Sequence, residues 1–187
     1  MRDNIPIKKN EYYEMDIHSM GSEGEGIGRI NNFTVFVPQA LSGERIKVKI
    51  LKVKSRYAYG KLIDIITPSG QRIEPICPLY AKCGGCQLQH VNYEEQLKIK
   101  KQRVEDDLVH IGKIENVLIH DTIGMQKPER YRNKVQFPVG VDEKLQKIQI
   151  GFYAQRSHRI IETDTCYIHH EVNDIIIQQV KKWMQDH

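Results

Sequence analysis

The chain has 187 residues, of which 40% are hydrophobic and 28% charged, and its formal net charge at pH 7 is +4. This composition is ordinary for a soluble globular protein, and the length allows one large domain or two small ones. No apolar run approaches the ~20 residues that a membrane-spanning helix needs. The first six residues lack the apolar stretch of a secretory signal, so we expect a cytoplasmic protein.

Residues 11–66 show short alternating hydrophobic patterns separated by turn signals. Tyr13, Met15 and Ile17 alternate with polar residues, and similar runs cover residues 33–37, 46–50 and 57–66. Several short strands at this spacing predict a small β-barrel. The glycine-rich segment 21–28 contains a GxGxG pattern, but a strand rather than a helix follows it. We therefore interpret this segment as a loop and not as a dinucleotide phosphate cradle.

A block of basic residues runs through the second half of this region, and no acidic residue interrupts it. It comprises Arg45, Lys47, Lys49, Lys52, Lys54, Arg56 and Lys61. Strand alternation places the first three on one face, away from the core. Such a stripe favours a polyanionic partner, with a solvated strand face protected by lysines as the alternative interpretation.

The segment Thr-Pro-Ser-Gly at residues 67–70 has the composition of a linker. Further along, Asn92 followed by Glu95 is typical of a helix N-terminus with a capping box, and Gly112 is a stop signal. We expect a helix over residues 93–111. Strands are expected over residues 131–141 and 147–155, joined by a turn at 142–144, then over 160–165, and a four-residue hydrophobic repeat predicts a helix after Glu171.

The strongest chemical signal is a set of four cysteines with the spacing C-x5-C-x2-C and a distant fourth: Cys77, Cys83, Cys86 and Cys166. In a reducing cytoplasm, closely spaced thiols indicate metal or redox chemistry rather than disulfides. Gly84 and Gly85 let the backbone curl around a bound centre. Four thiolates suit a [4Fe–4S] cluster or zinc. Structural zinc sites usually show two close cysteine pairs, whereas this chain has one, so the cluster is favoured, zinc comes second and ordinary buried cysteines third.

Several stretches of the chain resemble a known family. Residues 8–66 resemble a TRAM domain, a small OB-like RNA-binding barrel, through Gly-Glu-Gly-Ile-Gly-Arg, Val-Phe-Val-Pro and Leu-Ser-Gly-Glu-Arg-Ile-Lys-Val. Residues 77–90 resemble the cluster segment of the bacterial RNA (uracil-5-)-methyltransferases, and residues 131–134 and 151–166 match the central domain of that family. The resemblance implies a mixed β and α+β fold. A TRAM barrel at 8–66 would precede an incomplete iron–sulfur-binding α+β domain at 75–187.

The family resemblance also implies an activity. In these enzymes the TRAM and central domains grip RNA, and a C-terminal Rossmann-like domain binds S-adenosylmethionine. A cysteine thiolate there adds to C6 of uracil, C5 takes the methyl group, and a carboxylate removes the C5 proton. The transfer-RNA enzymes commonly lack the TRAM domain and the cluster, so 23S rRNA is the expected partner. We expect the catalytic residues to lie beyond His187, the 187-residue chain to be inactive alone, and helix 93–111 to pack on the absent domain.

Candidate RNA-binding residues come from both predicted domains. The basic ones are Arg45, Lys47, Lys49, Lys52, Lys54 and Arg56 in the barrel, with Arg132 and Lys134 sharing one side of the predicted strand 131–141. Phe36, Tyr57 and Tyr59 are candidates for base stacking, with core packing as the alternative. His169 and His170 are adjacent and diverge on any regular element, so we do not expect both to reach one metal ion.

Two other functions are compatible with the sequence alone. The first is a non-enzymatic RNA-binding module with a domain stabilised by an iron–sulfur cluster or zinc. The second is a zinc-stabilised protein-interaction domain without an RNA partner.

Overall fold

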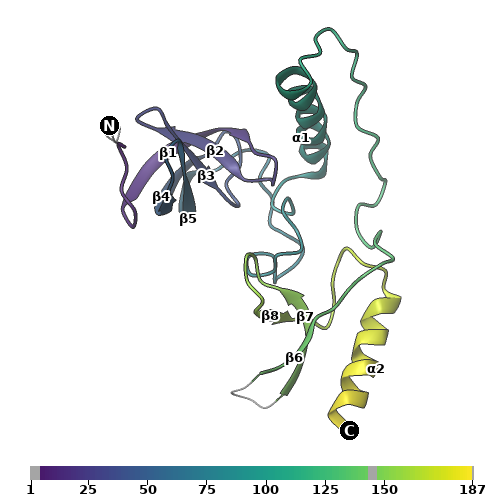
Figure 1. The fold of residues 1–187 in the computed structure, drawn as a ribbon. Helices are drawn as coiled ribbons and strands as arrows, with labels where there is room; N and C mark the ends of the chain where they lie inside the picture. Colours follow the sequence, from purple (N-terminus) through teal and green to yellow (C-terminus); the bar gives the residue numbers. More distant parts are fainter. Residues whose placement is uncertain (1–4, 143–146, 187) are drawn as a thin grey trace. The chain divides into compact units, whose positions relative to one another are not determined.

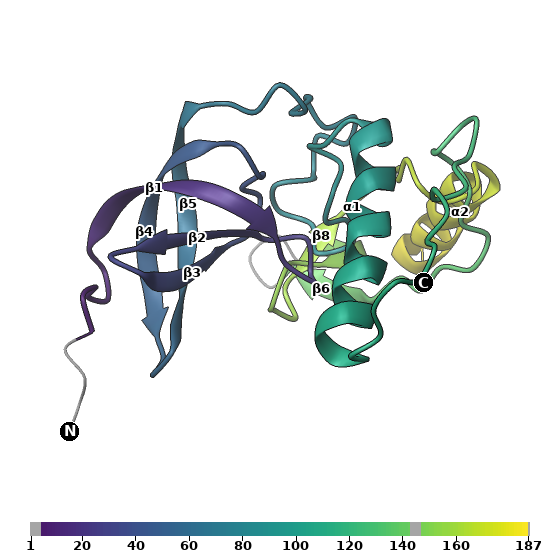
Figure 2. The same ribbon diagram turned by 90° about the horizontal axis from the view of Figure 1, so that it is seen from above.

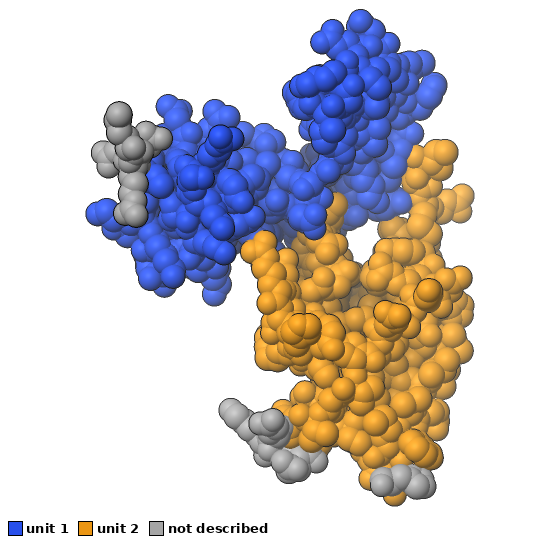
Figure 3. Space-filling view, viewed as in Figure 1, with its two compact units in different colours: residues 1–74, 90–122 blue, residues 75–89, 123–187 orange. Residues whose placement is uncertain are grey.

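The structure is a computed structural model that describes residues 5–142 and 147–186. These residues form two compact units, which Figure 3 shows in different colours. Unit 1 combines the N-terminal part of the chain up to Glu74 with residues 90–122. Unit 2 combines residues 75–89 with the chain from Ile123 onward.

The N-terminal part of unit 1 is a closed β-barrel, as the sequence predicts. Its strands are β1 (Tyr12–Met20), β2 (Gly26–Ile30), β3 (Phe33–Val37), β4 (Arg45–Val53) and β5 (Tyr57–Thr67). They pair in the order β1-β2-β3-β5-β4, and Figures 1 and 2 show this barrel from two sides. Neighbouring strands are antiparallel except β3 and β5, which are parallel. The predicted OB-like architecture is therefore confirmed.

Period-two alternation explains which side chains fill the barrel. On β4, Ile46, Val48 and Ile50 are fully buried, whereas Arg45 and Lys47 between them are exposed. Successive strand residues point to opposite faces, so one face of each strand supplies the core. The cations of β4 consequently lie on the outer surface of the barrel, as expected.

The glycine-rich segment is only partly a loop. Residues 21–25 form a turn with Gly24 at φ +79°, but Gly26 and Gly28 lie within β2. A Cβ atom at Gly28 would lie 2.3 Å from the carbonyl oxygen of Asp16 on β1. The loop interpretation is therefore wrong for these two glycines, because the close approach of β1 and β2 is what excludes a side chain.

The helical part of unit 1 follows residue 92. α1 spans Tyr93–Asp106 and continues as a π-helical turn, η1 (Asp107–Ile111), which together match the predicted helix 93–111. The Asn92 side chain accepts a hydrogen bond from the backbone N–H of Glu95 at 2.8 Å, as the capping pattern predicts. The sequence-based boundaries assign this helix to the second domain, whereas in the structure it belongs to unit 1.

Unit 2 is built around a small antiparallel sheet and one helix. The strands β6 (Val139–Asp142), β7 (Lys147–Tyr153) and β8 (Ile160–Glu162) pair in that order, and α2 (Val172–Asp186) contacts β7. The register Asp142 to Lys147 fits the predicted hairpin, although residues 143 and 144 of its turn lie outside the described residues.

The expected strand over residues 131–141 is wrong for its first eight residues. Only Arg132 makes a bridge there, to His169, and β6 begins at Val139. The backbone N–H groups of Arg130 and Arg132 donate to the carbonyls of Tyr167 and Ile168, so this segment follows the loop after β8 instead of a sheet strand. None of the helices in the described residues is both long and apolar enough to span a membrane.

Candidate metal centre and nucleic-acid interface

The three clustered cysteines lie on a compact loop in unit 2. The backbone N–H of Tyr80 donates to the carbonyl of Cys77 at 3.0 Å, and that of Cys83 donates to Leu79 at 2.8 Å. The Tyr80 ring is buried, and its hydroxyl donates to the carbonyl of Gln87 at 2.6 Å. One buried tyrosine thus ties the two ends of the cysteine loop together.

Gln89 is a second residue that holds this loop, and the sequence analysis missed it. Its carbonyl oxygen accepts from the backbone N–H of Cys77 at 3.3 Å, and its amide nitrogen donates to the sulfur of Cys86 at 3.2 Å. The amide therefore spans the first and third cysteines of the motif. The only signal for this role was a polar residue with both a donor and an acceptor just after the last clustered cysteine.

The cysteine loop is fastened to the end of β7. Cys83 makes a bridge with Ala154, and the N–H of Gly84 donates to the carbonyl of Tyr153 at 3.0 Å. A Cβ atom at Gly84 would lie 3.0–3.1 Å from backbone atoms of Tyr153 and Gln155. Gly84 is therefore required for close docking on the strand, in addition to the freedom that the sequence analysis assigned to it.

The structure brings the distant fourth cysteine into the electrostatic neighbourhood of the other three. The pKa of Cys86 is raised to about 11, mainly by burial, which outweighs a hydrogen bond from Gln89, and in smaller part by the charges of Cys166, Cys83 and Cys77. Burial also raises the pKa of Cys83, with contributions from Cys77 and Cys166. All four thiols are free of disulfides and partly exposed. A positively charged centre among them would remove this mutual repulsion.

The same thiols do not converge on one point. Over residues 5–142 and 147–186, no three Cys, His, Asp or Glu side chains are gathered so as to hold a single metal ion. The two adjacent histidines lie in different surroundings: His169 is buried with its ring edge-on to Phe137, and His170 is exposed. The four sulfurs are thus neighbours without forming a compact single-ion site.

The cations of the basic stripe differ in whether a carboxylate pairs with them. Arg45 forms ion pairs with Glu14 at 3.2 Å and Asp16 at 3.4 Å, so its charge is largely neutralised. In the part of the chain that the structure describes, no acidic partner pairs with the other six cations, which are Lys47, Lys49, Lys52, Lys54, Arg56 and Lys61. The positive field is therefore concentrated away from Arg45.

One site within this stripe combines cations with an exposed ring. Lys49 lies directly opposite Lys61 on β5 and opposite Tyr12 on β1. The ammonium groups of Lys47 and Lys49 lie 5.9 Å and 5.4 Å from the centre of the Tyr12 ring, which is 53% exposed. Like charges directly opposite each other in a sheet are unfavourable, so Lys49 and Lys61 suit an anionic partner.

The three candidate stacking aromatics form one cluster on the outside of the barrel. The ring centres of Phe36, Tyr57 and Tyr59 lie 5.5–6.0 Å apart, and each ring is half-buried. Their strand neighbours Val35 and Ala58 are fully buried, so the aromatic rings project away from the core. Core packing, the alternative interpretation, is therefore wrong for this cluster.

Comparison with known proteins supports the description of the barrel. Residues 6–63 match the TRAM domain model. The chain is 52% identical over 185 residues to an uncharacterized RNA methyltransferase of Clostridium tetani, a match that covers 99% of this chain and 40% of that protein. It is 45% identical over 181 residues to an uncharacterized RNA methyltransferase of Halalkalibacterium halodurans, covering 97% of this chain and 39% of the relative. Over nearly its whole length the chain is therefore similar to RNA methyltransferases, and its first part matches a TRAM domain. It spans about 40% of the length of these curated relatives.

A solved structure supports the fold of this TRAM-containing chain. The crystal structure of Pyrococcus abyssi tRNA (uracil-54, C5)-methyltransferase in complex with S-adenosyl-L-homocysteine matches 92% of this chain and 37% of its own. The TM-score is 0.61 at 21% sequence identity, so the likeness is one of fold.

The predicted RNA-binding residues of the TRAM barrel and of unit 2 fare differently. Arg45, Lys47 and Lys49 lie on the outer side of β4, although Arg45 is tied to two carboxylates, and Lys54 and Arg56 lie in the turn between β4 and β5. Arg132 and Lys134 are both exposed, but no strand places them on a common side. Their grouping was inferred from an alternation that the folded segment does not use, so they are weaker candidates than the barrel residues.

Proposed function

We propose that this chain is the RNA-binding and iron–sulfur-binding part of an S-adenosylmethionine-dependent 23S rRNA (uracil-5-)-methyltransferase. Its relationship to RNA methyltransferases supports the activity class. One observation carries the proposal. Within unit 2, Cys166 lies close enough to interact electrostatically with three thiols that lie 80 or more residues earlier in the chain.

The residues present fit a [4Fe–4S] cluster bound by Cys77, Cys83, Cys86 and Cys166. Structural zinc sites usually show two close cysteine pairs, whereas this chain has one, so zinc is the second candidate. A cluster of several irons and sulfides occupies more space and takes four thiolates around it. When bound, it supplies positive charge to the thiolates and links the cysteine loop to the segment before α2.

Anaerobic purification or reconstitution of this chain is expected to yield about four irons and four sulfides per chain, with the visible absorbance of a thiolate-bound cluster. Cys86→Ser should lose most of the iron because it removes one of the four proposed thiolate ligands. Lys82→Ala, which changes an exposed side chain on the same loop, is the matched control. Stoichiometric zinc without sulfide in the wild-type chain would refute the cluster.

The outer surface of the barrel supports the RNA partner. Unpaired cations of β4 and β5 can contact phosphates, and Tyr59 lies opposite Lys52, at the border between the aromatic cluster and the basic stripe. Stacking of a base on an exposed aromatic ring contributes ~1–3 kcal/mol without strong sequence preference. The combination suits an unpaired stretch of RNA, whose backbone and bases would be held by different side chains.

Replacement of both Lys49 and Lys61 by glutamine is expected to weaken RNA binding and to flatten its dependence on salt. Loss of two contacts to single-stranded phosphates reduces the slope of log K against log salt by about 1.4. Fluorescence anisotropy with a labelled 23S rRNA fragment at several salt concentrations measures this slope.

The matched control for that experiment is Arg45→Gln, because Arg45 is held by Glu14 and Asp16. It should change the slope by less than half as much as the double replacement. An unchanged slope in the double variant would exclude this face from RNA binding. Tighter binding to transfer RNA than to the 23S rRNA fragment would contradict the proposed substrate.

A further inference from the structure

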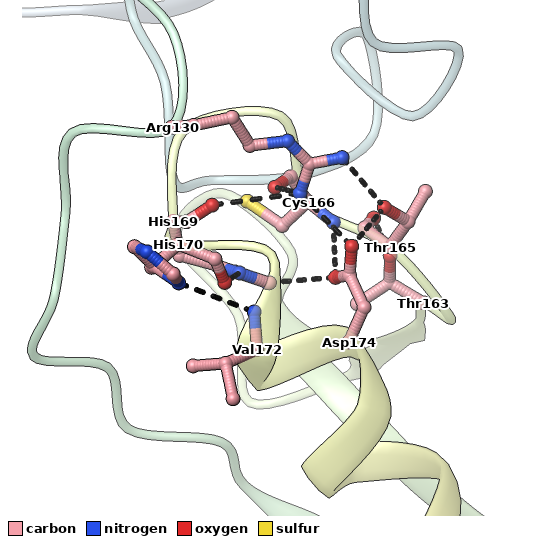
Figure 4. A network of polar contacts seen from close by, with 8 residues as sticks. All are labelled: Arg130, Thr163, Thr165, Cys166, His169, His170, Val172 and Asp174. Carbon is pink, nitrogen blue, oxygen red and sulfur yellow. Dashed lines mark hydrogen bonds and ion pairs between the residues drawn. The ribbon is translucent and has the colours of Figure 1, made fainter.

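A network of polar contacts surrounds the backbone of Cys166, and Figure 4 shows it from close by. Cys166 lies in the loop between β8 and α2, so no strand or helix fixes it directly. Two side chains from outside the loop, Arg130 and Asp174, hold it, and the Thr165 side chain of the loop bonds to both of them.

Asp174, in the first turn of α2, reaches back to the loop with both carboxylate oxygens. Oδ1 accepts from the backbone N–H of Cys166 at 3.3 Å and lies 3.5 Å from the imidazole Nε2 of His169. Oδ2 accepts from the Thr165 hydroxyl at 2.8 Å and from the Arg130 guanidinium at 2.9 Å. A carboxylate at a helix N-terminus is also favoured by the helix dipole, so α2 provides a stable base for these contacts.

Arg130 holds the same residue from its other side. Its Nη1 donates to the carbonyl of Cys166 at 2.9 Å and also pairs with Asp174. Its Nη2 lies 3.3 Å from the Thr165 hydroxyl, and its guanidinium lies 5.6 Å from the centre of the Tyr167 ring. The N–H and the C=O of Cys166 are thus held by an anion and a cation that are themselves paired.

We propose that Asp174 and Arg130 are positioning residues that set the backbone of Cys166 so that its thiolate joins the other three. This inference rests on the cluster of the proposed function. Neither side chain donates to or accepts from the Cys166 sulfur in any contact among the described residues, so both act through the main chain.

Cys166 needs positioning residues because it lies far along the chain from the other three cysteines. Cys166 is separated from Cys86 by 79 residues, whereas Cys83 and Cys86 are ordered by their own short loop. A ligand that is already placed costs less conformational entropy when a cluster binds, and residues that orient ligands typically change metal affinity by 10–100-fold when replaced.

Asp174→Asn keeps the size of the side chain and removes the charge that pairs with Arg130. Wild type, Asp174→Asn and Asp164→Asn are reconstituted anaerobically, and iron release to an excess of chelator is followed by the loss of visible absorbance. Release from Asp174→Asn is expected to be about 10–100-fold faster than from wild type. Asp164, on the same loop, is 70% exposed and contacts only Lys181 in the described part of the chain, so Asp164→Asn should match wild type.

The results of this experiment distinguish a failure of the positioning role from a failure of the proposed cluster. Absence of iron and sulfide from the wild-type chain would defeat the proposed function. Iron in the wild type with the same release rate in Asp174→Asn would defeat the positioning role alone.

A purely structural role has a different signature. Thr165→Ala removes the hydrogen bonds that the Thr165 hydroxyl donates to Asp174 and accepts from Arg130 but leaves the ion pair between those two residues, so its apo form should melt close to the wild-type apo form. If Asp174→Asn fails to fold, Thr165→Ala decides the question. Faster release from this variant supports positioning, and release at the wild-type rate overturns it.

Discussion

Arg72→Ala is expected to destabilise unit 1 by about 3–5 kcal/mol, because it leaves a buried carboxylate without its cation. The Glu44 side chain is fully buried, and that of Arg72 is 20% exposed. The guanidinium holds Glu44 with two hydrogen bonds, Nε to Oε1 at 2.5 Å and Nη2 to Oε2 at 2.9 Å. Removal of one partner from such a pair is costly even where the intact pair adds little net stability.

Several neighbours make Glu44 a junction between the barrel and the segment that follows it. The backbone N–H groups of Leu41 and Ser69 donate to its carboxylate, and Arg72 also donates to the carbonyl of Gln39. Burial alone would raise the pKa of Glu44, but the hydrogen bonds and charge of Arg72 and these N–H groups outweigh it and lower that pKa. Without Arg72, the carboxylate must take up a proton or admit water.

Urea unfolding of wild type, Arg72→Ala and Arg45→Ala at neutral pH measures this effect. Arg45 also pairs with two carboxylates, but these side chains are about half exposed, and exposed pairs contribute only ~0–1 kcal/mol. Arg45→Ala is therefore the matched control. The interpretation of the Glu44–Arg72 pair is wrong if the two variants lose the same stability.

The barrel could be predicted from the sequence because each strand has a recognisable pattern within its own residues. Alternation of buried and exposed residues is local, and turn residues separate one run from the next. The junction at Glu44 has no such local signal. Residues 67–70 look like a linker, and only the folded chain shows that Ser69 and Arg72 return to a buried carboxylate 25 and 28 positions earlier.

The candidate site also combines features that the sequence shows with features that only the folded chain shows. The three clustered cysteines were recognisable by spacing, but their attachment to β7 through Gly84 and their support by Gln89 depend on contacts between distant segments. The error at residues 131–138 has the same origin. This stretch alternates like a strand, yet its backbone hydrogen bonds go to the loop that carries Cys166.

His90→Gln is expected to make unit 1 less sensitive to mild acid. His90 is 1% exposed, and its pKa falls from 6.5 to about 4, mainly because burial disfavours the charged ring and secondarily because Arg72 repels it, while Glu44 opposes the shift. A lowered pKa means that the folded state favours the neutral ring. The associated stability is complete above pH ~6.5 and is lost as pH falls towards 4.

The size of this loss follows from the shift in pKa. A difference of about 2.5 units corresponds to about 3 kcal/mol by pH 4, since each unit is worth 1.36 kcal/mol. The lowered pKa of Glu44 adds acid sensitivity in the same direction, but only as pH falls below its ordinary value of 4.5. The interval between pH 6.5 and 4.5 therefore isolates His90.

Urea unfolding at a series of pH values in that interval distinguishes the variants. Wild type and His170→Gln, which changes an exposed histidine, should lose stability in parallel, whereas His90→Gln should show a flatter dependence from a lower starting point. The slope is the decisive quantity, because loss of a buried ring lowers stability at every pH. An equal slope in all three proteins would mean that His90 takes up its proton without unfolding, and the barrel junction would then contain a tolerated charge beside Arg72.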